Sequence, residues 1–118
     1  MTAEDRNKAT VQRFWSAVNE GDVEAILATF AEGAIARDPV DKPPLETNEQ
    51  RRAHFGGVLA SFTNLSAIPE FTTICGDHSA TKWAIKGTTQ DGTTVAIEGI
   101  DVARHDENGL IAELWGYV

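Results

Sequence analysis

The residues best suited to chemistry in this sequence are two aspartates, Asp38 and Asp101. Asp38 follows the run Ala34-Ile35-Ala36-Arg37 and precedes a proline. Asp101 lies in a segment that reads as a strand, and alternation makes it the only charge on a face that also carries Val95, Ile97, Gly99 and Ala103. An unpaired carboxylate there costs several kcal/mol, so it takes up a proton or finds a partner. One neutral carboxyl acting as donor and one charged carboxylate acting as base would make a proton-transfer site.

Each aspartate alone also fits a structural role, Asp38 by starting a turn before proline and Asp101 by bonding a backbone amide. Other motifs add little chemistry. The sequence has no nucleophile elbow, phosphate loop or dinucleotide fingerprint. Its three histidines form no metal-ligand spacing with one another or with Cys75, so we expect no metal and no cofactor. His54 is set apart from the other two because it adjoins an apolar helical stripe.

The last predicted strand carries a further group of candidates. Ile111, Glu113, Trp115 and Tyr117 share one parity. Trp115 and Tyr117 would either form pocket walls with polar tips or pack the sheet against helices. Glu113 on the same face would be a rim residue or a third carboxylate of the site.

Size and charge restrict the class of protein. At 118 residues, with 42% hydrophobic and 24% charged residues, residues 1–118 form one ordinary domain. The net charge of −8 argues against nucleic acid or an anionic membrane surface as a partner. A single cysteine, a polar N-terminus and the lack of a long apolar run lead us to expect a cytoplasmic protein.

Hydrophobic spacing predicts three helices in the first half. The first stripe ends at Gly21, a C-terminal cap, and Asp22 caps a second helix. A capping box at 47–50 precedes the third. Between the second and third helices we expect a short strand and an irregular loop. The three stripes are Val11, Phe14, Trp15 and Val18; Val23, Ile26, Leu27 and Phe30; and Phe55, Val58, Leu59 and Phe62.

The second half changes to strand periodicity. Strands are predicted at 71–75, 80–88, 93–104 and 110–117, separated by turn sequences that suit hairpins. Helices followed by an antiparallel meander indicate an α+β domain in which the helices cover one face of a curved sheet. A pocket would open between the two layers. The other sheet face, with Ala96, Ile100 and Val102, would be partly apolar, so we expect a homodimer.

Taken with the helical residues, the two aspartates make the chain resemble the Δ5-3-ketosteroid isomerases. These belong to the superfamily of nuclear transport factor 2 and the SnoaL-like polyketide cyclases. The resemblance runs from about Ala9 to Gly116. The stretches Asn19-Glu20-Gly21-Asp22 and Phe30-Ala31 are common to the superfamily and indicate the fold. More specific to the isomerases are Asp38-Pro39-Val40 and Ile100-Asp101, with Val11-Gln12-Arg13-Phe14 in support.

The resemblance implies a cone of three helices packed on a strongly curved antiparallel sheet, dimeric through the outer sheet face. It implies a cofactor-independent enzyme in which Asp38 moves a proton from C4 to C6 of a steroid through a dienolate. Asp101 would stay protonated and donate a hydrogen bond to the dienolate oxygen. The steroid-like ligand would lie in an apolar cavity walled by Phe14, Phe55, Trp115 and Tyr117.

Three positions depart from the isomerase pattern. Phe14 stands where the family has its main oxyanion-donating tyrosine, and Phe55 where a second tyrosine supports the first. Neither phenylalanine can donate a hydrogen bond, and losing one oxyanion donor typically costs roughly 10²–10³-fold in turnover. Glu113 falls at an apolar pocket position of the family.

Three functions therefore remain open. The first is a ketosteroid isomerase-like enzyme with Asp38 as base and Asp101 as enolate stabiliser. The second is another acid–base enzyme on the same fold, an aldol-type polyketide cyclase. The third is a non-catalytic module that binds a small apolar ligand. Retention of both aspartates argues against the third function, and loss of both tyrosines argues for it.

Overall fold

Three helices form the first layer of the computed structural model, which describes all residues 1–118. They are α1 (Ala3–Glu20), α2 (Val23–Leu27) and α3 (Asn48–Ala60). Their ends follow the sequence signals. Gly21 ends α1 in the left-handed conformation, and the Asp22 side chain accepts from the Ala25 amide at the start of α2. A capping box at Thr47 and Gln50 begins α3.

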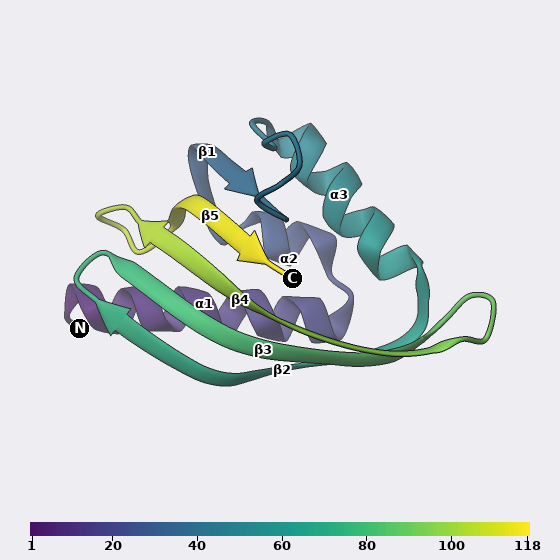
Figure 1. The fold of residues 1–118 in the computed structure, drawn as a ribbon. Coiled ribbons are helices and arrows are strands. Elements are labelled where there is room, and N and C mark those ends of the chain that lie inside the picture. The colour runs from purple at the N-terminus through teal and green to yellow at the C-terminus, as the bar shows by residue number, and fades with distance from the viewer.

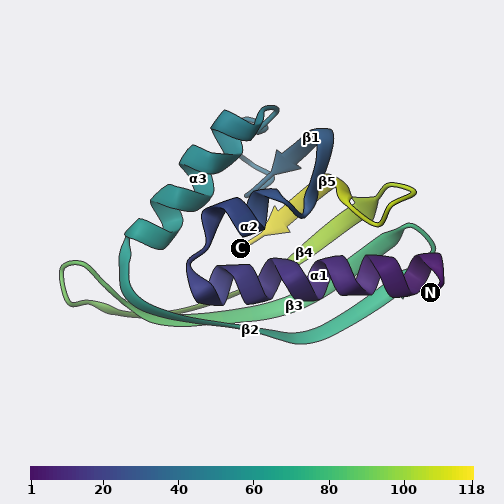
Figure 2. The same ribbon diagram turned by 180° about the vertical axis from the view of Figure 1, so that it is seen from behind.

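The second layer is a five-stranded sheet. Its strands are β1 (Phe30–Arg37), β2 (Phe62–Cys75), β3 (His78–Thr89), β4 (Thr94–His105) and β5 (Ile111–Tyr117). They lie in the order β1-β5-β4-β3-β2, and all neighbours are antiparallel except the parallel pair β1 and β5. The long strands β2 to β4 curve around the helices (Figures 1 and 2). The predicted α+β fold of three helices on a curved sheet is confirmed.

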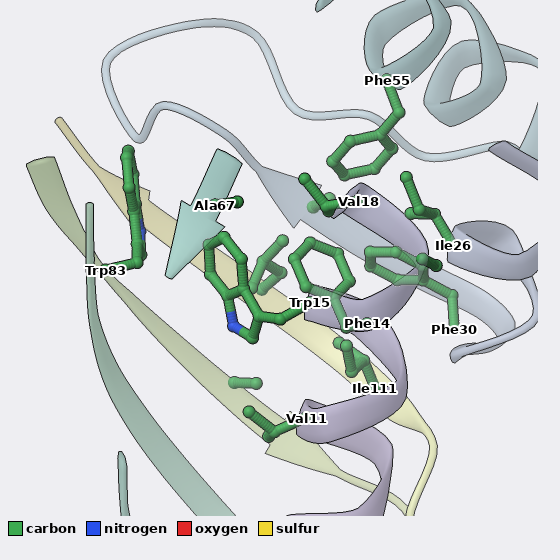
Figure 3. Packing of buried hydrophobic residues seen from close by; sticks show 14 of the residues in the cluster. Val11, Phe14, Trp15, Val18, Ile26, Phe30, Phe55, Ala67, Trp83 and Ile111 are labelled. Atoms are coloured by element: carbon green, nitrogen blue, oxygen red, sulfur yellow. The ribbon is translucent and has the colours of Figure 1, made fainter. Parts of the chain in front are cut away.

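An aromatic row joins the two layers. Phe14 and Trp15 of α1 lie between Trp83 of β3 and Phe55 of α3 (Figure 3). The Trp15 ring centre is 5.8 Å from that of Trp83, and the Phe14 ring centre is 5.9 Å from that of Phe55. All four side chains are buried, so this row lies at the centre of the core and supports the side chains that pack beside it.

Two element boundaries differ from those predicted. Helix α2 ends at Leu27, and Phe30 already begins β1, because the buried Phe30 side chain faces the core from a strand as well as it would from a helix. Strand β2 starts at Phe62 rather than at residue 71, so Phe62 belongs to the sheet and not to the third helix, which ends at Ala60. Apolar and polar residues do not alternate strictly over residues 62–70, and the sequence pattern therefore hides this half of the strand.

A register irregularity reverses the expected facing of β5. Arg104 pairs with Glu113, but His105 pairs with Ile111, so β5 has one extra residue at this point, as in a β-bulge. Ile111 and Leu114 are consequently both buried, although they differ in parity. Glu113 and the alternate residues after it turn to the outer face of the sheet.

None of the three helices has both the length and the apolar character that a membrane-spanning helix needs.

Candidate active site

A cavity of about 210 Å³ opens between the helices and the concave face of the sheet. Aromatic and aliphatic side chains form most of its wall, including Phe14, Trp15, Phe55 and Trp83. Its titratable side chains are Asp38, His54 and Asp101. No lysine, arginine, serine, cysteine or tyrosine lines it. The chemistry available inside is therefore proton transfer rather than attack by a side-chain nucleophile of those types.

Asp101 faces this cavity from β4, as the alternation predicted. The indole nitrogen of Trp83 donates to its Oδ1 at 3.0 Å. That indole has room because Gly99, on the neighbouring strand, carries no side chain; a Cβ there would collide with the ring. Desolvation, helped by the charge of Asp38 and opposed by the indole N–H, raises the pKa of Asp101 to about 7. Near neutral pH, a substantial fraction of the molecules therefore carries Asp101 in its protonated form, which can donate a proton.

Asp38 enters the cavity from the segment that follows β1. His54, on α3, places its Nε2 at 3.2 Å from Oδ2 of Asp38. Because a carboxylate can only accept, Nε2 carries the hydrogen in this bond. The His54 ring is fixed edge-on against Phe55, with 5.0 Å between ring centres. Both side chains keep about a quarter of their surface exposed, 25% for His54 and 23% for Asp38, so they lie nearer to solvent than the aromatic row.

The two aspartates meet at Gly116 of β5. A Cβ built on Gly116 would collide with Oδ1 of Asp38 and lie 3.4 Å from Oδ1 of Asp101. Two carboxyls therefore converge on one point of the backbone, and the absence of a side chain at this position lets them do so. The nearby charge of Asp38 adds to desolvation in raising the pKa of Asp101.

The other expected site residues divide into two groups. Phe14 and Phe55 line the cavity, as expected, and supply no hydroxyl. The expectation that Glu113, Trp115 and Tyr117 face the cavity is wrong for all three, because the irregularity in β5 turns them outward. Glu113 instead pairs with Arg37 and Arg104, each at 3.1 Å, and these bonds lower its pKa. The Arg37 guanidinium also lies 5.8 Å from the ring centre of Trp115.

Sequence reasoning missed two functional contacts, those of His54 and Trp83. His54 adjoins the buried face of α3, which is a visible but weak signal. Trp83 alternates with other inward residues of its strand, and nothing in the sequence indicates that its N–H reaches Asp101. No group of three or more His, Cys, Asp or Glu side chains is arranged to hold a metal ion.

Comparison with known proteins finds a family and similar folds that span almost the whole chain. The family model of the SnoaL-like domain matches residues 11–114. A solved structure of SalBIII is 28% identical to this chain, with a TM-score of 0.87, covering 97% of this chain and 91% of its own. SalBIII is described as an epoxide hydrolase/cyclase-like enzyme in pyran ring formation in the polyether salinomycin. A polyketide cyclase candidate from Xanthomonas campestris pv. campestris shares the fold, at 19% identity and a TM-score of 0.88, covering 99% of this chain and 93% of its own.

Proposed function

The chain belongs to the SnoaL-like domain family, and from that premise we propose that it is an acid–base enzyme that closes a ring within a neutral, polyketide-like substrate by an aldol-type reaction. The observation that carries the proposal is the convergence of Asp38 and Asp101 at Gly116 inside an apolar cavity. The likeness to SalBIII supports cyclisation as the class of reaction.

The two aspartates would take opposite roles. Asp38, with His54 bonded to Oδ2, accepts the proton of a carbon next to a carbonyl group. The resulting enolate carbon attacks a second carbonyl of the same molecule, and a carbon–carbon bond forms as the C=O π bond breaks. Asp101 gives its proton to the new alkoxide. Asp38 then holds the proton that Asp101 has lost, and transfer between these neighbouring groups restores the starting state.

The cavity also limits the substrate. With no lysine or arginine in its wall and two aspartates facing it, the cavity does not favour a phosphate or carboxylate group, so the enclosed part of the substrate is neutral. Its 210 Å³ lies below the roughly 300–1,000 Å³ of pockets for drug-sized ligands. The exposed Val58 and Ile97, 40% and 43% accessible, mark its mouth. We infer that the reacting end of a longer chain enters while the remainder stays outside.

Isomerisation of a Δ5-3-ketosteroid is the second candidate, favoured by the same pair of aspartates. It uses the same proton-transfer chemistry, with Asp38 as base and Asp101 as donor to the dienolate oxygen. Phe14 and Phe55 weaken it, since the cavity then has no tyrosine hydroxyl for that oxygen. The small cavity volume weakens it further.

Two reactions test the proposal. The first is hydrogen–deuterium exchange at the carbon next to the carbonyl of 2-tetralone, followed by NMR. The protein should accelerate the exchange, Asp38→Asn should abolish the acceleration, and Asp77→Asn at an exposed turn should leave it unchanged. The second is aldol ring closure of 2,6-heptanedione to its cyclic hydroxyketone. Absence of both activities would contradict the proposal, and rapid turnover of a Δ5-3-ketosteroid alone would favour the isomerase.

A further inference from the structure

A second, much smaller cavity of about 20 Å³ adjoins the first. It shares Asp101, Phe14 and Trp15 with the main cavity and extends to the start of β3. Its polar wall consists of Asp101, Ser79 and Thr81, and the rest is aliphatic or aromatic. A water molecule needs at least about 10–15 Å³ of such space and typically about three hydrogen bonds. The cavity has the volume for one water and three side chains to bind it.

The hydrogen bonds beyond Ser79 have a fixed direction. The Gly109 carbonyl can only accept, so the Nδ1 of His105, 2.9 Å away, donates to it. Burial lowers the pKa of His105, so its ring is neutral and the other nitrogen, Nε2, has no hydrogen. Nε2 must then accept from the Ser79 hydroxyl, at 2.9 Å. The only hydrogen of the Ser79 hydroxyl is used in this bond, so toward the cavity its oxygen can only accept.

We propose that the small cavity binds one water molecule between Asp101 and Ser79, and that the Ser79–His105 pair thereby favours the protonated form of Asp101. In this arrangement Thr81, the direct cross-strand neighbour of Asp101, donates its hydrogen to the Thr72 hydroxyl, 3.1 Å away, so toward the cavity it too accepts. The water donates one hydrogen to Ser79 and the other to Thr81, which leaves only its oxygen to accept from the Asp101 carboxyl. A hydroxyl that was free to rotate would favour the carboxylate as readily as the acid.

The titratable surroundings of Asp101 agree with this assignment. Asp38 faces it across Gly116, with His54 of α3 beyond, and no lysine or arginine lines either cavity. Asp106, Asp77 and His78 act on His105 at the far end of the chain of hydrogen bonds. The inference rests on the proposed function only for its catalytic consequence. That consequence is that Ser79 and His105 are positioning residues that keep Asp101, the acid of the reaction, protonated.

The experiment measures the Asp101 titration by carboxyl ¹³C NMR without any substrate. In Ser79→Ala the pKa of Asp101 should fall by roughly half a pH unit to one unit, because the water loses its acceptor and can turn to donate to the carboxylate. Ala103→Gly is the matched control. It enlarges the same cavity by one carbon and keeps the hydroxyl, so the pKa should stay close to that of the parent.

Equal pKa values in Ser79→Ala and the parent, or equal falls in both variants, would overturn the inference. A high-resolution crystal structure of the unchanged protein gives a second readout. It should show one water within hydrogen-bond distance of Asp101 and Ser79, and a dry cavity would refute the site. Because neither measurement uses turnover, either can succeed while the ring-closure assay fails, and the two proposals can fail separately.

Discussion

Adding one methyl group at Gly116 should disable the site while leaving the fold intact. A Cβ at this position collides with Oδ1 of Asp38, the far end of a side chain that can move. The carboxylate must shift by roughly an ångström to restore normal van der Waals contact. A displacement of about 1 Å from the productive geometry can cost on the order of 100-fold in rate. We therefore expect Gly116→Ala to lower 2-tetralone exchange by about that factor.

Stability should change little in this variant. Replacing glycine by alanine in a strand stabilises by roughly 0.5–1 kcal/mol through the unfolded chain, which offsets part of the strain of moving Asp38. Gly57→Ala in α3 is the control, since a Cβ there meets nothing within 4 Å. Urea unfolding and the exchange assay should be run on both variants. Full activity in a well-folded Gly116→Ala protein would refute the placement of Asp38 as the base.

Four further outcomes follow from the site and the sheet. Asp38→Asn should keep the fold and ligand binding but lower exchange by roughly 10²–10⁴-fold, and an unchanged rate would move the base elsewhere. The pKa of Asp101 is raised from 3.8 to about 7, so between pH 4 and pH 7 the folded protein keeps a proton that the unfolded chain has lost. The free energy of unfolding therefore falls as the pH rises through this range. The loss is on the order of 4 kcal/mol, and urea unfolding of Asp101→Asn across this range should lack it. Phe14→Tyr should raise Δ5-3-ketosteroid turnover by up to roughly 10²–10³-fold if the new hydroxyl reaches the ligand oxygen, whereas a flat rate would count against the isomerase. The outer sheet face exposes Phe71 and Ile100, 64% and 45% accessible, so we propose that two copies pair there; sedimentation equilibrium should show a dimer that Phe71→Glu dissociates, and a monomeric parent would exclude it.

Local signals in the sequence were enough to predict most of the fold. The left-handed Gly21, the Asp22 cap and the capping box at Thr47 determine where these helices begin and end, and each depends on neighbours within four residues. The facing of β4 was also predictable, because its register with β3 is regular from Thr94 to Arg104. Asp101 therefore lies where alternation placed it.

The facing of β5 was not predictable in the same way. One extra residue near Ala112 depends on how β5 pairs with β4, a contact between separate strands, and it reverses every later side chain. For that reason Glu113, Trp115 and Tyr117 were assigned to the wrong face. The same reversal points Gly116 inward, and the meeting of Asp38 with Asp101 depends on it. The irregularity in β5 that made the predicted facing wrong is therefore also what allows the two aspartates to meet.

The arrangement of the two aspartates is costly for stability and useful for chemistry. A buried carboxyl with a pKa near 7 makes the folded state less stable at neutral pH than an asparagine of the same shape would. A single substitution of Asp101 would remove this loss of stability. The structure instead surrounds Asp101 with Trp83, Ser79 and a second carboxyl. The environment raises the pKa of Asp101, the acid of the pair, which is what a proton donor in such a site requires. A module that only held an apolar ligand would gain nothing from this expense, so the cost itself argues for catalysis.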